Sequence, residues 1–256
     1  MNSPGNMLST VSTFTVCLVV LCAFPVQVMA DECVVLLHGL VRTSNSMNKI
    51  ERELGSDGYL VVNVSYPSRR ATIEQLADQA VPEGISECRS RDASPISFVT
   101  HSLGGLLLRQ YFDSRELSDL SRVVMLAPPN GGTEIADPFF QKLPGYDLLN
   151  GPVGRQLGTS EENPPRMLGP VSFELGVIAG TRSTNPFLSA FLPKQDDGKV
   201  TVKNTRVEGM CEFIAMPVTH SLMMRNPNVI NQVRSFLKEG RFYGESAEHL
   251  TCEQPI

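Results

Sequence analysis

One serine in the sequence lies in a setting that can turn a weak alcohol into a nucleophile. Ser102 follows the apolar run Ile96-Ser97-Phe98-Val99 and precedes Leu103-Gly104-Gly105. A strand, a tight turn and a helix in immediate succession form a nucleophile elbow, which lifts the serine Oγ above the edge of a sheet. The amino end of the helix would direct its positive dipole toward a developing oxyanion. The pattern predicts a nucleophile at Ser102, although a serine before a helix is most often an N-cap.

A serine alcohol needs a base to take its proton, and histidine commonly fills that role. The sequence contains four histidines, His38, His101, His220 and His249. His220 follows a predicted strand and precedes the last predicted helix. His38 and His101 are expected to be structural, and His249 lies in a polar, acidic tail where solvent would surround it.

A second signal precedes the elbow by about sixty residues, where the apolar run Val34-Val35-Leu36-Leu37 leads into His38-Gly39-Leu40. With both segments, the sequence resembles the α/β-hydrolases of the bacterial lipase and esterase kind, from Val34 to about Phe242. The resemblance implies an α/β-hydrolase fold and a serine hydrolase without metal or cofactor. Thr100 stands where the family usually has Gly or Ala, so this elbow must accommodate a bulkier side chain.

The resemblance also implies partners for the serine. The family's histidine loop corresponds to His220, and its Asp-Gly-x-Val sequence corresponds to Asp197-Gly198-Lys199-Val200. Asp197 is therefore the expected acid, and the adjacent Asp196 is the alternative. The chain order serine, aspartate, histidine is the order of this family.

The family's oxyanion hole corresponds to the backbone N–H groups of Leu40 and Leu103. Each such donor typically lowers the barrier by about 3–4 kcal/mol. The stretch Ala127-Pro128-Pro129-Asn130-Gly131-Gly132-Thr133 is similar to one that lines the site in related lipases, and it could equally be a structural turn.

Strands and helices alternate along the chain, which predicts an α/β fold with a parallel sheet. Continuous apolar runs indicate strands that are buried on both faces. The expected strands are residues 33–37, 59–65, 96–100, 122–127, 174–181 and a sixth within 206–218, and the expected helices are 44–55, 72–88, 103–114 and 226–238. We expect one α/β-hydrolase domain over residues 31–256, with a mostly parallel sheet of about six strands, flanking helices and a small lid or none.

Residues 131–173 contain six prolines, which interrupt any long helix. A connection of this length is usually functional, often a lid. Phe139 and Phe140 within it are candidate substrate-binding residues that would line an acyl pocket. They and the apolar residues that follow them could equally form the core face of a helix.

The composition excludes some classes of partner. The 256 residues are 41% hydrophobic and 19% charged, which is typical of a globular protein. The net charge is −5, Trp is absent and no basic run is present, so no nucleic acid is expected to bind. The expected partner is a small-molecule or lipid ester, with contact to a membrane or lipid surface as an open alternative. No protein partner is predicted.

Residues 1–30 form the expected leader, because they contain no Asp, Glu, Lys or Arg. The apolar run at residues 14–24 has the length of a signal-peptide core and is too short for a membrane span. Cleavage after Val28-Met29-Ala30 would begin the mature chain at Asp31 and export it to the periplasm or the medium. An uncleaved anchor at residues 14–24 is the alternative, since no Lys or Arg precedes the run.

Four cysteines follow the leader, Cys33, Cys88, Cys211 and Cys252, and four cysteines allow three connectivities. Exported proteins fold in oxidising compartments, so two disulfides are expected. In the hydrolase sheet that the resemblance implies, the first and third predicted strands are neighbours, which favours a Cys33–Cys88 bridge. Cys211 and Cys252 would then form the second bridge.

These residues together predict a serine hydrolase that cleaves carboxylic esters through an acyl-enzyme. His220 would take the proton of Ser102, and Asp197 would orient the histidine. A thioesterase or an acyltransferase would use the same three residues and differ in the acyl donor or acceptor. A non-catalytic binding protein on a hydrolase scaffold would be expected to lack one of the three.

Overall fold

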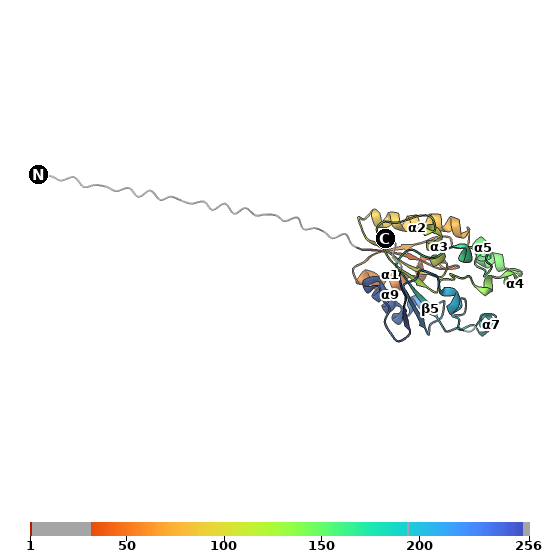
Figure 1. Cartoon of the computed structure of the whole chain (residues 1–256). Helices are drawn as coiled ribbons and strands as arrows, with labels where there is room; N and C mark the ends of the chain where they lie inside the picture. Colours follow the sequence, from red (N-terminus) through yellow and green to blue (C-terminus); the bar gives the residue numbers. More distant parts are fainter. Residues whose placement is uncertain (2–31, 194, 253–256) are drawn as a thin grey trace.

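A computed structural model describes Met1, residues 32–193 and residues 195–252 (Figure 1). Its centre is a seven-stranded sheet in the order β2-β1-β3-β4-β5-β6-β7. The strands are β1 Cys33–Leu37, β2 Leu60–Val64, β3 Ile96–His101, β4 Leu120–Leu126, β5 Leu175–Gly180, β6 Glu212–Met216 and β7 Ala247–His249. The predicted leader, residues 1–30, and its alternative as an anchor lie outside the described residues, Met1 excepted.

The expected mostly parallel sheet is confirmed, with β1 to β6 parallel. The sequence did not predict β7, which pairs antiparallel with β6 in the register Glu212↔His249. This short strand has no apolar alternation, and it depends on a partner far away in the chain. His249 is exposed, as expected, and its Nδ1 also lies 2.7 Å from a carboxylate oxygen of the buried Glu212.

Successive residues of a strand point to opposite faces of the sheet, and here each face is covered by helices. In β1, Val35 and Leu37 pack with α2 and α3, whereas Val34 and Leu36 pack with α1 and α9. Figure 1 shows these two pairs of helices on either side of the strands. The covering helices are α1 Asn48–Ser56, α2 Ile73–Arg89, α3 Leu103–Phe112 and α9 Pro227–Glu239. Because both faces of the sheet are buried, the strands are continuous apolar runs in the sequence.

The connection between β4 and β5 contains short helices only, as its prolines predicted. Proline begins both α4 and α6, and α5 is kinked at Gly151, whose φ is 64°. The buried Arg109 of α3 fixes this connection by donating to the carbonyl oxygens of Asn130 and Leu168 at 3.1 and 2.7 Å. The helices of this connection are η2 Glu134–Ala136, α4 Pro138–Gln141, α5 Tyr146–Gln156 and α6 Pro164–Met167. The short helices described elsewhere are η1 Ser44–Ser46, α7 Pro186–Ser189, α8 Val202–Thr205 and η3 Met223–Arg225.

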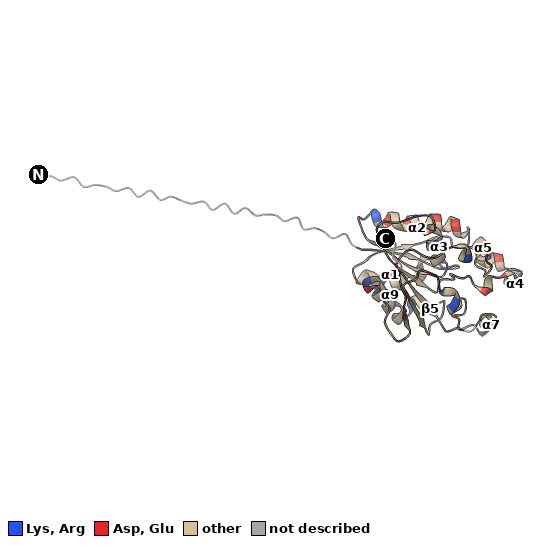
Figure 2. Ribbon diagram, in the orientation of Figure 1, with Lys and Arg blue, Asp and Glu red and all other residues tan. Residues whose placement is uncertain are grey.

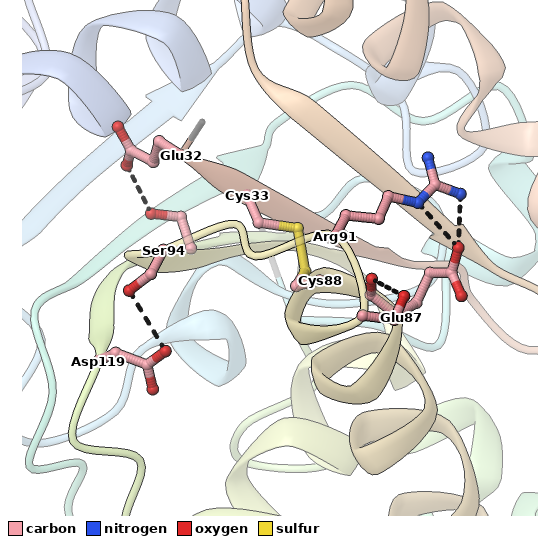
Figure 3. The surroundings of a disulfide bond; sticks show 9 residues. Glu32, Cys33, Glu87, Cys88, Arg91, Ser94 and Asp119 are labelled. Atoms are coloured by element: carbon pink, nitrogen blue, oxygen red, sulfur yellow. Dashed lines mark hydrogen bonds and ion pairs between the residues drawn. A yellow bond between two sulfur atoms is a disulfide. The ribbon is translucent and has the colours of Figure 1, made fainter. Parts of the chain in front are cut away.

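Both expected disulfides are present. Cys33 at the start of β1 is bonded to Cys88 in the last turn of α2, beside the Arg91–Glu87 ion pair (Figure 3). Cys211 is bonded to Cys252 and so holds the segment that carries β7 against β6. Two disulfides are typical of proteins that fold in an oxidising compartment. In the described part of the chain, no helix is long and apolar enough to cross a bilayer.

Candidate active site

The turn between β3 and α3 holds Ser102 in an uncommon backbone conformation. Its φ is 53° and its ψ is −118°, which a residue with a side chain adopts at a cost of about 1–3 kcal/mol. The Ser102 N–H donates to the carbonyl of Leu126 in β4 at 2.8 Å. A Cβ on Gly104 would lie 2.6 Å from the carbonyl oxygen of Leu37, so glycine allows α3 to begin directly against β1. These contacts fix the strained turn.

Thr100 fits into the elbow, although the family usually has a smaller residue there. Its side chain is fully buried, and its Oγ1 has no hydrogen-bond partner among the described residues. Gly105 leaves room for it, because a Cβ on Gly105 would approach Thr100 Oγ1 to 3.3 Å. An unsatisfied buried hydroxyl costs about 1–3 kcal/mol, so Thr100 adds a local cost to the elbow.

The structure brings Ser102, His220 and Asp197 together from three separate loops. His220 Nε2 lies 3.0 Å from Ser102 Oγ, and His220 Nδ1 lies 2.8 Å from Asp197 Oδ2. Since a carboxylate only accepts, Nδ1 carries the proton, and Nε2 is free to accept from the serine hydroxyl. Both His220 and Asp197 are buried, which strengthens the hydrogen bonds between them.

The second carboxylate oxygen of Asp197 also accepts hydrogen bonds. Oδ1 accepts the N–H groups of Lys199 and Val200 at 3.0 and 2.8 Å, so the carboxylate cannot turn away from His220. The adjacent Asp196 has different partners, because its Oδ1 accepts from the Ser189 hydroxyl and from the N–H of Gly198. The geometry therefore favours Asp197 over Asp196 as the partner of His220.

The loop after β1 lies against the serine. A Cβ on Gly39 would be 3.1 Å from Ser102 Cβ. His38 stacks on Tyr66 with ring centroids 4.0 Å apart, and the Tyr66 hydroxyl donates to the His38 carbonyl. The N–H groups of Leu40 and Leu103 donate to no other described residue, so both are available to a bound oxyanion. The pKa of His38 is lowered by burial, which keeps the ring neutral.

No protein-family model matches the sequence, and no curated protein matches it. Several solved structures do match this chain. The mature lipase BlEst2 of Bacillus licheniformis matches with a TM-score of 0.63 and 18% identity, over 81% of this chain and 92% of that one. The phospholipase PlaB of Legionella pneumophila matches with a TM-score of 0.63 and 18% identity, over 81% of this chain and 58% of that one. Lipase B of Aspergillus fumigatus matches with a TM-score of 0.62 and 15% identity, over 82% of this chain and 53% of that one.

The chain has the α/β-hydrolase fold. It spans most of mature BlEst2 and little more than half of PlaB and of the Aspergillus lipase. At these identities the likeness concerns the fold, and the activity has to be argued from the site.

Within this α/β-hydrolase fold, His101 joins the serine turn to the histidine loop. Its ring is buried 4.9 Å from the ring of His220, and its Nε2 lies 3.0 Å from the His220 carbonyl oxygen. Burial is the main cause that holds the pKa of His101 well below its ordinary value, so the ring is neutral. Its Nε2 then carries the proton and donates to His220, which makes His101 structural, as expected.

Phe139 and Phe140 of the α/β-hydrolase domain lie in α4, which follows β4. Phe140 is buried, whereas Phe139 is 63% exposed, so the core interpretation holds for Phe140 and is wrong for Phe139. The ring centroids of Phe139 and Phe140 lie 6.0 and 5.4 Å from that of Phe191. The ring centroid of Phe187, in α7, lies 5.4 Å from the same ring. Substrate binding by Phe139 and Phe140 stays a prediction.

The stretch Ala127–Thr133 is hydrogen-bonded to residues 199–205, which follow Asp197 in the chain. The Thr133 hydroxyl donates to the carbonyl oxygen of Lys199 at 2.5 Å. Asn130 Nδ2 donates to the carbonyl oxygen of Thr205 at 2.8 Å. The N–H of Gly131 donates to the carbonyl oxygen of Asn204, also at 2.8 Å. These contacts favour the structural interpretation of this segment.

The sequence analysis missed Tyr66 and Arg109, which hold the loop after β1 and the β4–β5 connection. The only signal for Tyr66 is an aromatic residue just after a strand, which is also typical of core packing. Burial raises the pKa of the Tyr66 hydroxyl, so it stays a donor at neutral pH.

Gly104→Ala should lower the free energy of unfolding by about 2 kcal/mol, because the new methyl group meets the backbone carbonyl of Leu37. Urea unfolding measures the change. Gly169→Ala is the matched control, since no atom lies within 4 Å of that Cβ position. Equal losses of stability in the two variants would contradict the tight approach of α3 to β1.

Buried, neutral His101 should make stability depend on pH. The unfolded chain protonates this histidine near its ordinary pKa of 6.5, whereas the folded protein does not until much lower pH. Protons therefore favour the unfolded state, and stability falls below about pH 6.5 by up to about 1.4 kcal/mol per pH unit for each such histidine. His38 acts with the same sign.

Urea unfolding of wild type and His101→Gln at pH 7, 6 and 5 measures this effect. The glutamine amide can still donate to His220 but cannot be protonated in this range. The variant should lose less stability between pH 7 and 5 than the wild type. An equal loss in both proteins would show that His101 does not contribute.

Proposed function

We propose that this protein is a serine hydrolase that cleaves carboxylic, lipid-like esters through an acyl-enzyme intermediate. The observation that carries the proposal is the continuous hydrogen-bond path from Ser102 Oγ through His220 to the Asp197 carboxylate, with lengths of 3.0 and 2.8 Å. A serine that only caps a helix would not need a buried imidazole and a buried carboxylate aligned behind it. Ser102 also makes no side-chain cap to α3.

The proposed reaction begins when Ser102 Oγ attacks the acyl carbon and His220 Nε2 takes its proton. Asp197 stabilises the imidazolium that forms. The oxyanion of the tetrahedral intermediate accepts the N–H groups of Leu40 and Leu103. Collapse of the intermediate expels the alcohol, which takes the proton from His220. A water molecule, deprotonated by the same imidazole, then releases the acid and restores Ser102.

Two observations support a lipid-like ester as substrate. BlEst2 is described as a lipase and PlaB as a phospholipase. The aromatic cluster of Phe139, Phe140, Phe187 and Phe191 combines one buried ring with exposed ones, on elements that follow β4 and β5. We propose that this cluster receives the acyl chain. The leader and the two disulfides support export of the mature enzyme.

The proposed roles are tested by kcat/KM for 4-nitrophenyl esters with acyl chains from acetyl to palmitoyl. Ser102→Ala and His220→Ala should each lower kcat by about 10⁴-fold or more, and Asp197→Asn by about 10³–10⁴-fold. Asp196→Asn is the matched control and should lower it by less than about tenfold, because Asp196 binds Ser189 and Gly198.

Circular dichroism and urea unfolding establish that each variant is folded. Turnover by Ser102→Ala at the wild-type rate would refute the nucleophile. An equal loss in Asp196→Asn and Asp197→Asn would refute the assignment of the acid. The acyl chain that gives the highest kcat/KM distinguishes an esterase from a lipase.

A further inference from the structure

His38 directly follows β1 and precedes the proposed oxyanion hole, and the reaction described above gives its side chain no role. The residue is fully buried. Charged residues are found on outer helices such as α2 and α5 (Figure 2), whereas β1 contains none. Because a buried ring does not exchange its hydrogen bonds with water, those bonds are stronger than bonds on the surface.

One nitrogen of the His38 ring contacts the peptide group that carries a proposed oxyanion donor. His38 Nδ1 lies 2.9 Å from the carbonyl oxygen of Gly39. That oxygen and the Leu40 N–H belong to the same peptide group, since each carbonyl is joined to the nitrogen of the next residue. A trans peptide is planar, and its C=O and N–H point in opposite directions. A contact that fixes the Gly39 carbonyl therefore also fixes the direction of the Leu40 N–H.

The proton of the His38 ring is on the nitrogen that this contact requires. A carbonyl oxygen only accepts hydrogen bonds, so Nδ1 is the donor to Gly39. The other ring nitrogen, Nε2, lies 3.5 Å from the backbone nitrogen of Tyr66 and accepts its N–H. Burial lowers the pKa of His38, so the ring is neutral and carries a single proton. The two neighbours together define one tautomer, with the proton on Nδ1.

Tyr66 holds both the ring and the backbone of His38. The two rings stack with their centroids 4.0 Å apart and their planes 8° from parallel. The Tyr66 hydroxyl donates to the His38 carbonyl oxygen, and Tyr66 is itself buried. With the backbone contact to Nε2, these contacts prevent the imidazole from turning away from Gly39.

The peptide group of Gly39 and Leu40 is also confined from the serine side. β1 pairs in parallel with β3, so the loop after β1 lies beside the serine turn. A Cβ on Gly39 would be 2.9 Å from His101 Nδ1 and 3.1 Å from Ser102 Cβ. The N–H of Arg42 is a second donor to the Gly39 carbonyl oxygen, at 3.3 Å. Donors to a carbonyl polarise its peptide group, which makes the N–H of that group a stronger donor.

We infer, on the basis of the proposed function, that His38 is a positioning residue for the oxyanion hole and that Tyr66 holds it in place. The His38 Nδ1–H orients and polarises the peptide group whose Leu40 N–H binds the oxyanion. The substrate oxygen carries this charge in the transition state and the tetrahedral intermediate, not in the bound ester. Loss of the contact should therefore lower kcat and leave KM nearly unchanged.

The first test compares two substitutions of His38, with the 4-nitrophenyl ester that gives the highest kcat/KM. His38→Phe removes both ring nitrogens and keeps an aromatic ring to stack on Tyr66. It should lower kcat by about ten- to hundredfold, because the donor is misaligned but not removed. His38→Asn supplies an amide that can donate near the position of Nδ1, so it should recover most of this loss. KM should change by less than about threefold in both variants.

The second test measures the inhibition constant Ki of an alkyl trifluoromethyl ketone. Ser102 Oγ adds to the ketone carbon while His220 takes the proton, which leaves a negatively charged oxygen in the oxyanion hole. Ki should rise in His38→Phe by about the factor by which kcat falls. Tyr66→Phe removes the hydroxyl and keeps the stack, and it should raise Ki by about three- to tenfold.

Tyr146→Phe is the matched control. It loses the same kind of bond, from a tyrosine hydroxyl to a backbone carbonyl, but that bond joins Tyr146 to Gly154 within α5 at 2.9 Å. The control should keep the wild-type Ki. Neither Ki nor KM depends on the fraction of the enzyme that is folded, so a partial loss of folding does not imitate the expected effect.

The inference is overturned if His38→Phe binds the ketone as tightly as the wild type, or if it raises KM without lowering kcat. Equal losses of kcat in His38→Phe and His38→Asn would also overturn it. If circular dichroism shows that His38→Phe is unfolded, Tyr66→Phe decides, and an unchanged Ki in that variant overturns the inference. The proposed function fails in a different way, through absent turnover of every ester by the wild type or through undiminished turnover by Ser102→Ala.

Discussion

The φ of 53° at Ser102 is a local cost of about 1–3 kcal/mol that the surrounding fold has to offset. The strand before the serine is fully buried in the sheet, and the helix after it begins against β1. The Ser102 N–H is bonded to β4. Because both sides of the turn are fixed, the chain cannot relax at Ser102 without separating a strand or a helix from the core. The position of the Oγ above the sheet edge depends on this constraint.

The remaining parts of the site are connected to the serine turn through buried polar contacts. His101 holds the backbone of His220, and Asp197 holds its ring. Asp197 in turn is held by the backbone of its own loop, and Thr133 binds that loop from the β4 side. The two contacts of His220 are buried, where loss of one partner leaves the other unsatisfied, and those of Lys199 are partly buried. The fold itself therefore holds these side chains in place, which is the preorganisation that the proposed reaction requires.

Much of this arrangement could be predicted from local sequence. Apolar runs located the buried strands because both faces of the sheet are covered, and the strand-turn-helix pattern identified Ser102. Residues whose role depends on distant partners could not be found in this way. β7 depends on pairing with β6, and Tyr66 depends on its stack with His38. The sequence left open whether Phe139 lines a pocket or packs in the core, because an apolar pattern cannot distinguish a core face from a surface face of a short helix.

The central claim is that the fold makes Ser102 a nucleophile through His220. A 4-nitrophenyl alkylphosphonate tests it directly, because it forms a stable bond only with an activated serine. Tandem mass spectrometry of the treated protein should place the phosphonyl group on the peptide that contains Ser102, with no labelling of the urea-unfolded chain or of His220→Ala. Labelling of another serine, labelling that persists without His220, or no labelling of the folded protein would contradict the account.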